Sequence, residues 1–196
     1  MVENKQAGET ADDAAPAISW RSEGRGEAFR ALAGKVAAGE PLQSPVGLDA
    51  EARRAHVRST IREDHSARIE QRSAGARQKF DALADDFYKF FRGTALLFYR
   101  DMTGQDAGMP TVMALGDVHP ENFGVMPDRH GTPIFGVNDF DEAAYAPFTW
   151  DIKRGATGFW IATAEIAGLK RKKRRKIVAR FVEGYLDAMQ GYAERA

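Results

Sequence analysis

The sequence contains no cysteine, which excludes disulfides, thiolate metal sites and a cysteine nucleophile. Any bound metal must therefore use oxygen or imidazole ligands. There is no apolar run of the roughly 18 residues that a membrane-spanning helix requires, so we expect no membrane partner. There is also no excess of charge, because Lys+Arg and Asp+Glu both total 28. Without a net field we expect no specific nucleic-acid partner.

The N-terminal segment, residues 1–45, has few large apolar side chains and is rich in Ala, Gly, Glu and Pro. Such a composition buries too little surface to offset the entropy of ordering, and it predicts a flexible leader. The first residues, MVENKQAGETADDAAP, are polar and acidic, unlike a secretory signal. We therefore expect a cytoplasmic protein with one folded domain over residues 46–196.

The expected domain is mostly helical. Residues 48–77 have helical propensity but few apolar positions, which predicts one or two surface helices. Helical spacing of apolar residues continues over 80–91, and 95–102 predicts a further short helix. After Trp150 the chain is helical again. We expect Phe159, Ile161, Ile166 and Leu169 on one helix, and an apolar stripe from Ile177 to Met189 on the next.

Strands are expected only in the middle of the chain. Residues 111–115 form a compact apolar run that enters Gly116. Residues 123–126 and 134–137 predict two strands, joined by the turn-rich residues 127–131 into a hairpin. The fold class predicted from these patterns is α+β.

Two polar motifs that flank this hairpin indicate a candidate catalytic site. Residues 116–122 read G-D-V-H-P-E-N, and the returning strand ends in N-D-F-D-E at 138–142. Phosphoryl transfer needs an acceptor for the proton of the attacking hydroxyl and oxygen ligands for Mg²⁺. Asp117, Asn122 and Asp139 supply these groups if the hairpin brings them together. Each one taken singly would also fit ordinary turn chemistry.

These motifs resemble known families. G-D-V-H-P-E-N is similar to the catalytic loop of protein kinases, and more closely to that of aminoglycoside phosphotransferases and choline kinases. Together with F-F-R-G-T-A-L-L-F-Y-R-D at 90–101 and W-D-I-K-R at 150–154, they resemble the bacterial family called domain of unknown function 2252. The resemblance covers about residues 80–168. It implies a protein-kinase-like large lobe with a small catalytic-loop hairpin, and Mg²⁺ and ATP as cofactors.

The resemblance assigns a role to each matching residue. Asp117 would be the proton acceptor, and Asn122 and Asp139 would hold the metal. His119 would brace the loop, and Asp151 would anchor its backbone from the following helix. Asp141 and Glu142 would support the metal site. Arg92 lies in the F-R-G motif, and a phosphate contact is our hypothesis for it.

The sequence also departs from the kinase pattern. Leu115 and Gly116 stand where kinases place the His or Arg that precedes the catalytic Asp, so another residue must stabilise the loop. No glycine-rich G-x-G-x-x-G loop and no phosphate-pairing Lys of the V-A-I-K type precede Asp117. The resemblance implies that these segments follow the motifs in a permuted order. We therefore expect the nucleotide lobe in downstream sequence or in another chain.

Three functions are compatible with these observations. The first is a phosphotransferase that acts on a small-molecule hydroxyl, or the catalytic half of one. The second is a catalytically degenerate module that binds a nucleotide or a partner. The third is a metallophosphoesterase, which would need further metal ligands that the downstream sequence lacks. The basic run Lys170 to Lys176 is expected to be a solvated interhelical turn and helix start.

Overall fold

A computed structural model describes residues 37–39 and 45–195. The chain divides into two compact units, Met1–Leu42 and Gln43–Ala196, and the description below concerns the second. The leader expected over residues 1–45 lies almost entirely outside the described residues. None of the described helices combines the length and apolar character needed to cross a bilayer.

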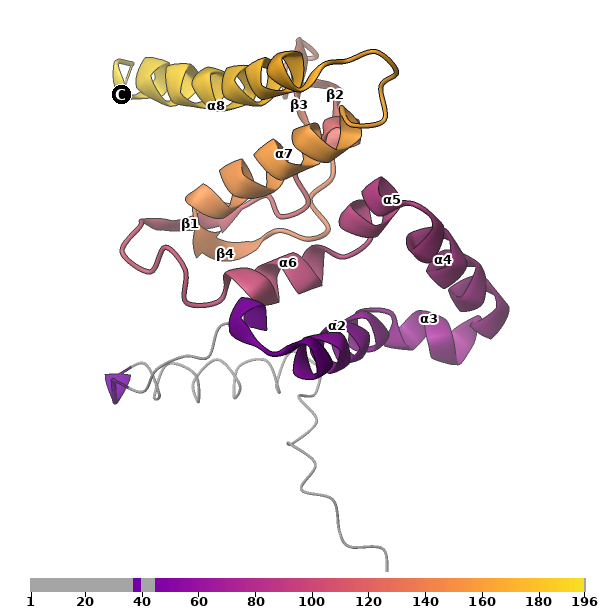
Figure 1. The fold of residues 1–196 in the computed structure, drawn as a ribbon. Coiled ribbons are helices and arrows are strands. Elements are labelled where there is room, and N and C mark those ends of the chain that lie inside the picture. Colours follow the sequence, from indigo (N-terminus) through magenta and orange to yellow (C-terminus); the bar gives the residue numbers. More distant parts are fainter. Residues whose placement is uncertain (1–36, 40–44, 196) are drawn as a thin grey trace, which may run out of the picture. The chain divides into compact units, whose positions relative to one another are not determined.

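The first half of the second unit is a series of short helices (Figure 1). A 3₁₀ turn, η1 (Pro45–Gly47), is followed by α2 (Ala50–Asp64), α3 (Ser66–Gln71), α4 (Ser73–Asp85), α5 (Phe87–Arg92) and α6 (Ala95–Met102). Polar side chains define the starts of two of them. The carboxylate of Asp49 accepts from the backbone N–H groups of Glu51 and Ala52 at 2.9 Å, and Asp86 accepts from that of Lys89 at 2.6 Å.

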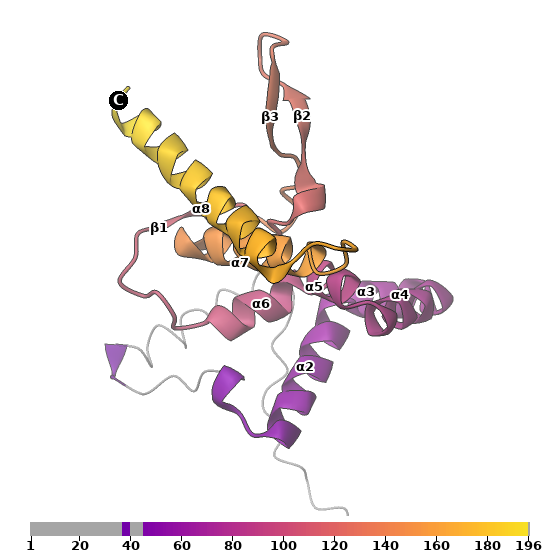
Figure 2. The ribbon, with the colours of Figure 1, turned by 45° about the horizontal axis from the view of Figure 1, so that its top comes forward.

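Two further helices follow the strands. α7 (Thr149–Ala162) and α8 (Arg171–Ala193) pack on each other (Figures 1 and 2). Two glycines of α7 permit close packing, because a Cβ at Gly155 would collide with the ring of Phe181, and one at Gly158 would lie 3.1 Å from Cβ of His119. α7 therefore packs against α8 at one glycine and against the candidate catalytic loop at the other.

The expectation that Ile166 and Leu169 continue the helix of Phe159 is wrong, because α7 ends at Ala162. The hydroxyl of Thr163 donates to the carbonyl of Phe159 at 2.6 Å, and Gly168 has a positive φ of 75°. Such a backbone angle does not belong to a right-handed helix. Apolar spacing alone did not reveal this turn.

The strands form two separate antiparallel pairs. β2 (Phe123–Pro127) pairs with β3 (Pro133–Val137) as the predicted hairpin. Its turn is fixed by the Asp128 carboxylate, which accepts from the backbone N–H groups of His130 and Thr132 at 2.8 Å. β1 (Thr111–Ala114) was also expected, but its partner β4 (Ala144–Pro147) was not. Alanine and proline favour strands poorly, so β4 depends on its pairing with β1.

The core lies between the helices and the loop that follows β1. Tyr88 and Phe91 of α5 cluster with Ile161 of α7. Ala114, at the end of β1, and Val118, in the loop, are fully or nearly fully buried. The fold is α+β, mostly helical with two small antiparallel sheets. The motif 116–122 follows the buried end of β1 and packs against α7.

Candidate active site

The hairpin brings the two polar motifs together. The register Phe123↔Val137 continues beyond the strands, because the backbone N–H of Asn138 donates to the carbonyl of Asn122 at 3.0 Å. Asp139 directly follows Asn138, the residue that is paired with Asn122, and adjacent Cα atoms are about 3.8 Å apart. The main chain at 139 therefore lies beside that of 122.

Asp117 is bound by a buried arginine. Oδ1 of Asp117 accepts from Nε of Arg154 at 2.9 Å and from Nη2 at 2.5 Å. The Arg154 side chain is 1% exposed, and Nη2 also donates to the carbonyl of Phe91 at 2.7 Å. Its guanidinium lies 4.3 Å from the centre of the Phe91 ring. Arg154 thus links α7, α5 and the loop.

His119 contacts the other oxygen of the same carboxylate. Its Nε2 lies 3.3 Å from Oδ2 of Asp117, and its side chain is 2% exposed. Burial alone would raise the pKa of Asp117. The hydrogen bond from His119 and the charge of Arg154 outweigh that effect and hold the pKa below the ordinary value of 3.8. Asp117 is therefore an ionised carboxylate at neutral pH.

The side-chain amide of Asn122 is oriented by a hydrogen bond from its nitrogen. Nδ2 donates to the backbone carbonyl of Asp117 at 2.9 Å, and the residue is 9% exposed. In the described part of the chain, Oδ1 accepts no hydrogen bond. The amide is thus oriented by its nitrogen.

Asp151 holds the start of the loop. Its two carboxylate oxygens accept from the backbone N–H groups of Leu115 at 2.7 Å and Gly116 at 3.0 Å. Burial raises the pKa of Asp151, and the two N–H groups oppose that rise. These are the contacts that the resemblance led us to expect of Asp151.

Gly116 allows a second segment to approach the loop. Its φ is +98°, and a Cβ there would collide with the backbone carbonyl of Glu142. The same carbonyl accepts from the hydroxyl of Tyr99 at 3.2 Å. The pKa of Glu142 is raised by burial and by the neighbouring carboxylates of Asp64 and Asp117. Negative charge therefore gathers where residues 139–142 meet the loop.

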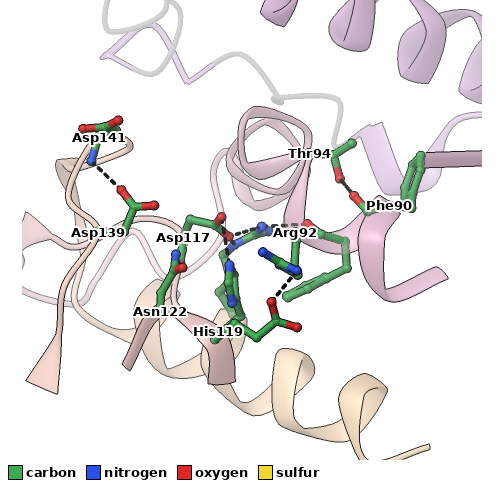
Figure 3. Close-up of polar contacts among 11 residues, drawn as sticks. Phe90, Arg92, Thr94, Asp117, His119, Asn122, Asp139 and Asp141 are labelled. Carbon is green, nitrogen blue, oxygen red and sulfur yellow. Dashed lines mark hydrogen bonds and ion pairs between the residues drawn. The ribbon is translucent and has the colours of Figure 1, made fainter. Parts of the chain in front are cut away.

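Asp139 and Asp141 are both exposed. The backbone N–H of Asp141 donates to Oδ1 of Asp139 at 3.4 Å. Figure 3 shows this pair on one side of Asp117 and Arg92 on the other. Within residues 37–39 and 45–195, no three His, Asp or Glu side chains converge into a ready-made cation site.

Arg92 forms an ion pair with Glu121, the residue that precedes Asn122. Its Nη1 lies 2.5 Å from Oε2 of Glu121, and the two side chains are 38% and 52% exposed. Its guanidinium also lies 5.8 Å from the centre of the Tyr88 ring. Glu121 is thus the ion-pair partner of Arg92.

Arg154 is the site residue that the sequence reasoning missed. It lies three positions after Asp151 in W-D-I-K-R, and residues three apart share a helix face. Its position three residues after Asp151, the expected anchor of the loop, was the available signal. Arginine is rarely fully buried unless it is paired, and its partner, Asp117, is distant in sequence.

Comparison with known proteins places the chain in a family but gives it no activity. Residues 71–196 match the bacterial family described as an uncharacterized protein conserved in bacteria, DUF2252. No curated protein matched the chain, and no solved structure did. The match spans more than half of the sequence and includes the motifs 116–122 and 138–142. The chain therefore belongs to the DUF2252 family.

Proposed function

We propose that residues 116–142 form the catalytic loop and metal-binding hairpin of an ATP-dependent phosphotransferase of the protein-kinase-like and aminoglycoside phosphotransferase-like superfamily. Its substrate would be a small-molecule hydroxyl. The main support is the hydrogen bond from Asn138 to Asn122, which brings the backbone of Asp139 beside an amide that is itself bonded to Asp117. This pairing brings the main chain of Asp139, which comes 17 positions after Asn122 in the sequence, beside the loop that carries Asp117 and Asn122.

In this proposal Asp117 orients the attacking hydroxyl and accepts its hydrogen bond. Its lowered pKa keeps it ionised as a hydrogen-bond acceptor. Arg154 and His119 fix the direction of the carboxylate, and Asp151 fixes the backbone that carries it. Catalysis of this kind relies mainly on positioning and electrostatic stabilisation.

The oxygen donors suit Mg²⁺ bound together with a nucleotide. Mg²⁺ is usually held by one or two carboxylates, with waters and substrate phosphates completing its octahedron. Oδ1 of Asn122 and the exposed carboxylate of Asp139 are suitable protein donors, and Asp141 is bonded beside Asp139. When bound, the ion would neutralise phosphate charge during transfer. A site with few protein ligands is therefore compatible with Mg-ATP.

The proposal is tested by Mg²⁺-dependent turnover of ATP in the presence of a panel of small hydroxyl compounds. We expect turnover when the wild-type chain is assayed together with the nucleotide lobe that the resemblance places downstream or in another chain, and loss of that turnover in Asp117→Ala and Asp139→Ala. Asp187→Ala is the matched control, because Asp187 is an exposed residue of α8, and it should retain activity. Unchanged turnover in both site variants would reject the proposal.

A catalytically degenerate nucleotide-binding module is the second candidate. The observation that favours it is that both oxygens of Asp117 already have partners, Arg154 and His119. A protein of this kind would be stabilised by ADP and Mg²⁺ in a thermal-shift titration while showing no turnover. Stabilisation that is lost in Asp139→Ala, without activity in any variant, would favour it over the phosphotransferase.

A further inference from the structure

A second concave site lies away from the catalytic loop, between α2 on one side and α4 and α5 on the other. Its volume is about 470 Å³, within the range of sites that hold ligands or inserted side chains. The floor is apolar and is formed by Val57, Ile61, Phe80, Leu83 and Phe90. We call this site the α2–α4 groove. It shares no lining residue with the site around Asp117.

The rim of the groove carries a row of positive charge. Arg54, Arg58 and Arg62 line it and are exposed. They are spaced by four residues, so they form a line along one side of α2 at intervals of about 6 Å. In the described part of the chain, no carboxylate forms an ion pair with any of the three. Like charges at this spacing repel one another, and this chain offers no described partner that offsets the repulsion.

The other arginine contacts of α2 show that the groove wall is held in place. Arg53 pairs with Asp101 of α6 at 2.5 Å. Arg100 of α6 donates to Thr60 at 2.9 Å and to Glu63 at 2.7 Å. These bonds join α2 to α6 and leave the row of three arginines outside the network. One wall of the groove, α2, is therefore fixed by its bonds to α6.

We infer that the α2–α4 groove binds an amphipathic acidic helix of a partner protein. The apolar floor would receive the large side chains of such a helix, and carboxylates at four-residue spacing would meet Arg54, Arg58 and Arg62. Recognition of an amphipathic helix in an apolar groove is a recurrent binding mode. Charge complementarity along two helical turns fixes the register of the partner.

Other anionic ligands fit these features less well. A bilayer is flat on this scale and cannot fill a concave floor, although basic helices do bind membranes. A single-headed amphiphile such as a fatty acid would occupy one arginine and leave the others without partners. Nucleic acid would match the charge but not the apolar floor. The combination of a row of charges with an apolar floor selects the acidic helix.

The test uses a fluorescent 15-residue peptide with leucines at helical spacing and glutamates every fourth residue, titrated with the full chain and followed by anisotropy. We expect saturable binding that weakens with salt. The triple variant Arg54→Glu, Arg58→Glu, Arg62→Glu should weaken it by about tenfold or more. A peptide with lysine in place of glutamate should bind that variant and not the wild type. This exchange of charge distinguishes a direct contact from loss of folding.

Two further variants complete the test. Ala84 is exposed and lines the groove, so Ala84→Trp should fill the groove and abolish binding without loss of helix content by circular dichroism. Arg77→Glu changes an exposed charge of α4 that does not line the groove and should leave binding unchanged. Failure of the acidic peptide to bind, or equal binding by the wild type and the triple variant, would overturn the inference. Preferential binding of oleate, anionic vesicles, RNA or a second copy of the chain would also overturn it.

Discussion

The guanidinium of Arg154 donates two hydrogen bonds to a single carboxylate oxygen of Asp117, from Nε at 2.9 Å and from Nη2 at 2.5 Å. One partner is in the loop after β1 and the other is on α7. Both side chains are largely removed from water, at 14% and 1% exposure. The sequence lacks the His or Arg that precedes the catalytic Asp in kinases, and in this structure a buried arginine from the following helix contacts the loop.

Replacement of that arginine should strongly destabilise the protein. Arg154→Met leaves the Asp117 charge buried without its main partner, which costs roughly 3–5 kcal/mol, measured by urea unfolding. Arg180→Met is the matched control, because Arg180 also pairs with a carboxylate, Glu183, but both side chains are exposed. The control should change stability by less than about 1 kcal/mol. Equal effects of the two substitutions would show that the buried pair is not important for folding.

The anchor on α7 should be sensitive to loss of a single oxygen. Asp151→Asn retains one acceptor but replaces the other with an N–H donor, so either Leu115 or Gly116 loses its partner. An unpaired buried N–H costs roughly 1–3 kcal/mol, and we expect a loss of that size in chemical denaturation. Asp187→Asn, on the exposed surface of α8, should be close to neutral. A neutral Asp151→Asn would contradict the anchoring role.

Gly116 should tolerate substitution less well than another glycine with a similar backbone angle. Gly116 and Gly131 have φ values of +98° and +82°, so alanine is strained at both, by about 1–2 kcal/mol. Only at Gly116 would the added methyl group meet another segment, the main chain of Glu142, whereas nothing lies within 4 Å at Gly131. We expect Gly116→Ala to cost at least about 2 kcal/mol more than Gly131→Ala. Equal costs would mean that residues 139–142 do not pack on the loop.

The two buried carboxylates should affect acid stability in opposite directions. The pKa of Asp117 is lowered when folded, so its contribution is complete above the unfolded value, near 3.8, and is lost as pH falls through the folded value. The pKa of Asp151 is raised when folded, so its contribution is complete below that unfolded value and is lost as pH rises through the folded value.

Denaturation of the wild type and two variants between pH 2.5 and 7 checks this prediction. As pH falls below about 4, the stability deficit of Asp117→Asn relative to the wild type should shrink. The deficit of Asp151→Asn should grow over the acidic part of the same range. Parallel curves for the wild type and both variants would contradict the assigned shifts.

The parts of the fold that were predictable are those with strong local signals. The β2–β3 hairpin combines apolar strand residues with a turn that Asp128 and Gly131 favour. α6 has the bounds expected from its apolar spacing, Ala95–Met102. The polar motifs at 116–122 and 138–142 could be related to each other because the hairpin fixes their pairing.

The parts that were not predictable depend on tertiary contacts. β4 is a strand because β1 pairs with it. Arg174 belongs to the basic run expected to be solvated, yet it donates to the carbonyl of Trp160 at 2.6 Å and stacks on the Trp160 ring. Arg154 was missed for the same reason, since its environment consists of residues distant in sequence.

The central claim is that Asn122 and Asp139 bind one divalent cation together with a nucleotide. The most direct test replaces Mg²⁺ with Mn²⁺, which prefers the same oxygen ligands, and follows free Mn²⁺ by electron paramagnetic resonance in the presence of a non-hydrolysable ATP analogue. We predict saturable Mn²⁺ binding by the wild type, weakened about tenfold or more in both Asn122→Ala and Asp139→Ala and unchanged in Asp187→Ala. Mn²⁺ binding of equal strength in the wild type and both site variants would contradict the account.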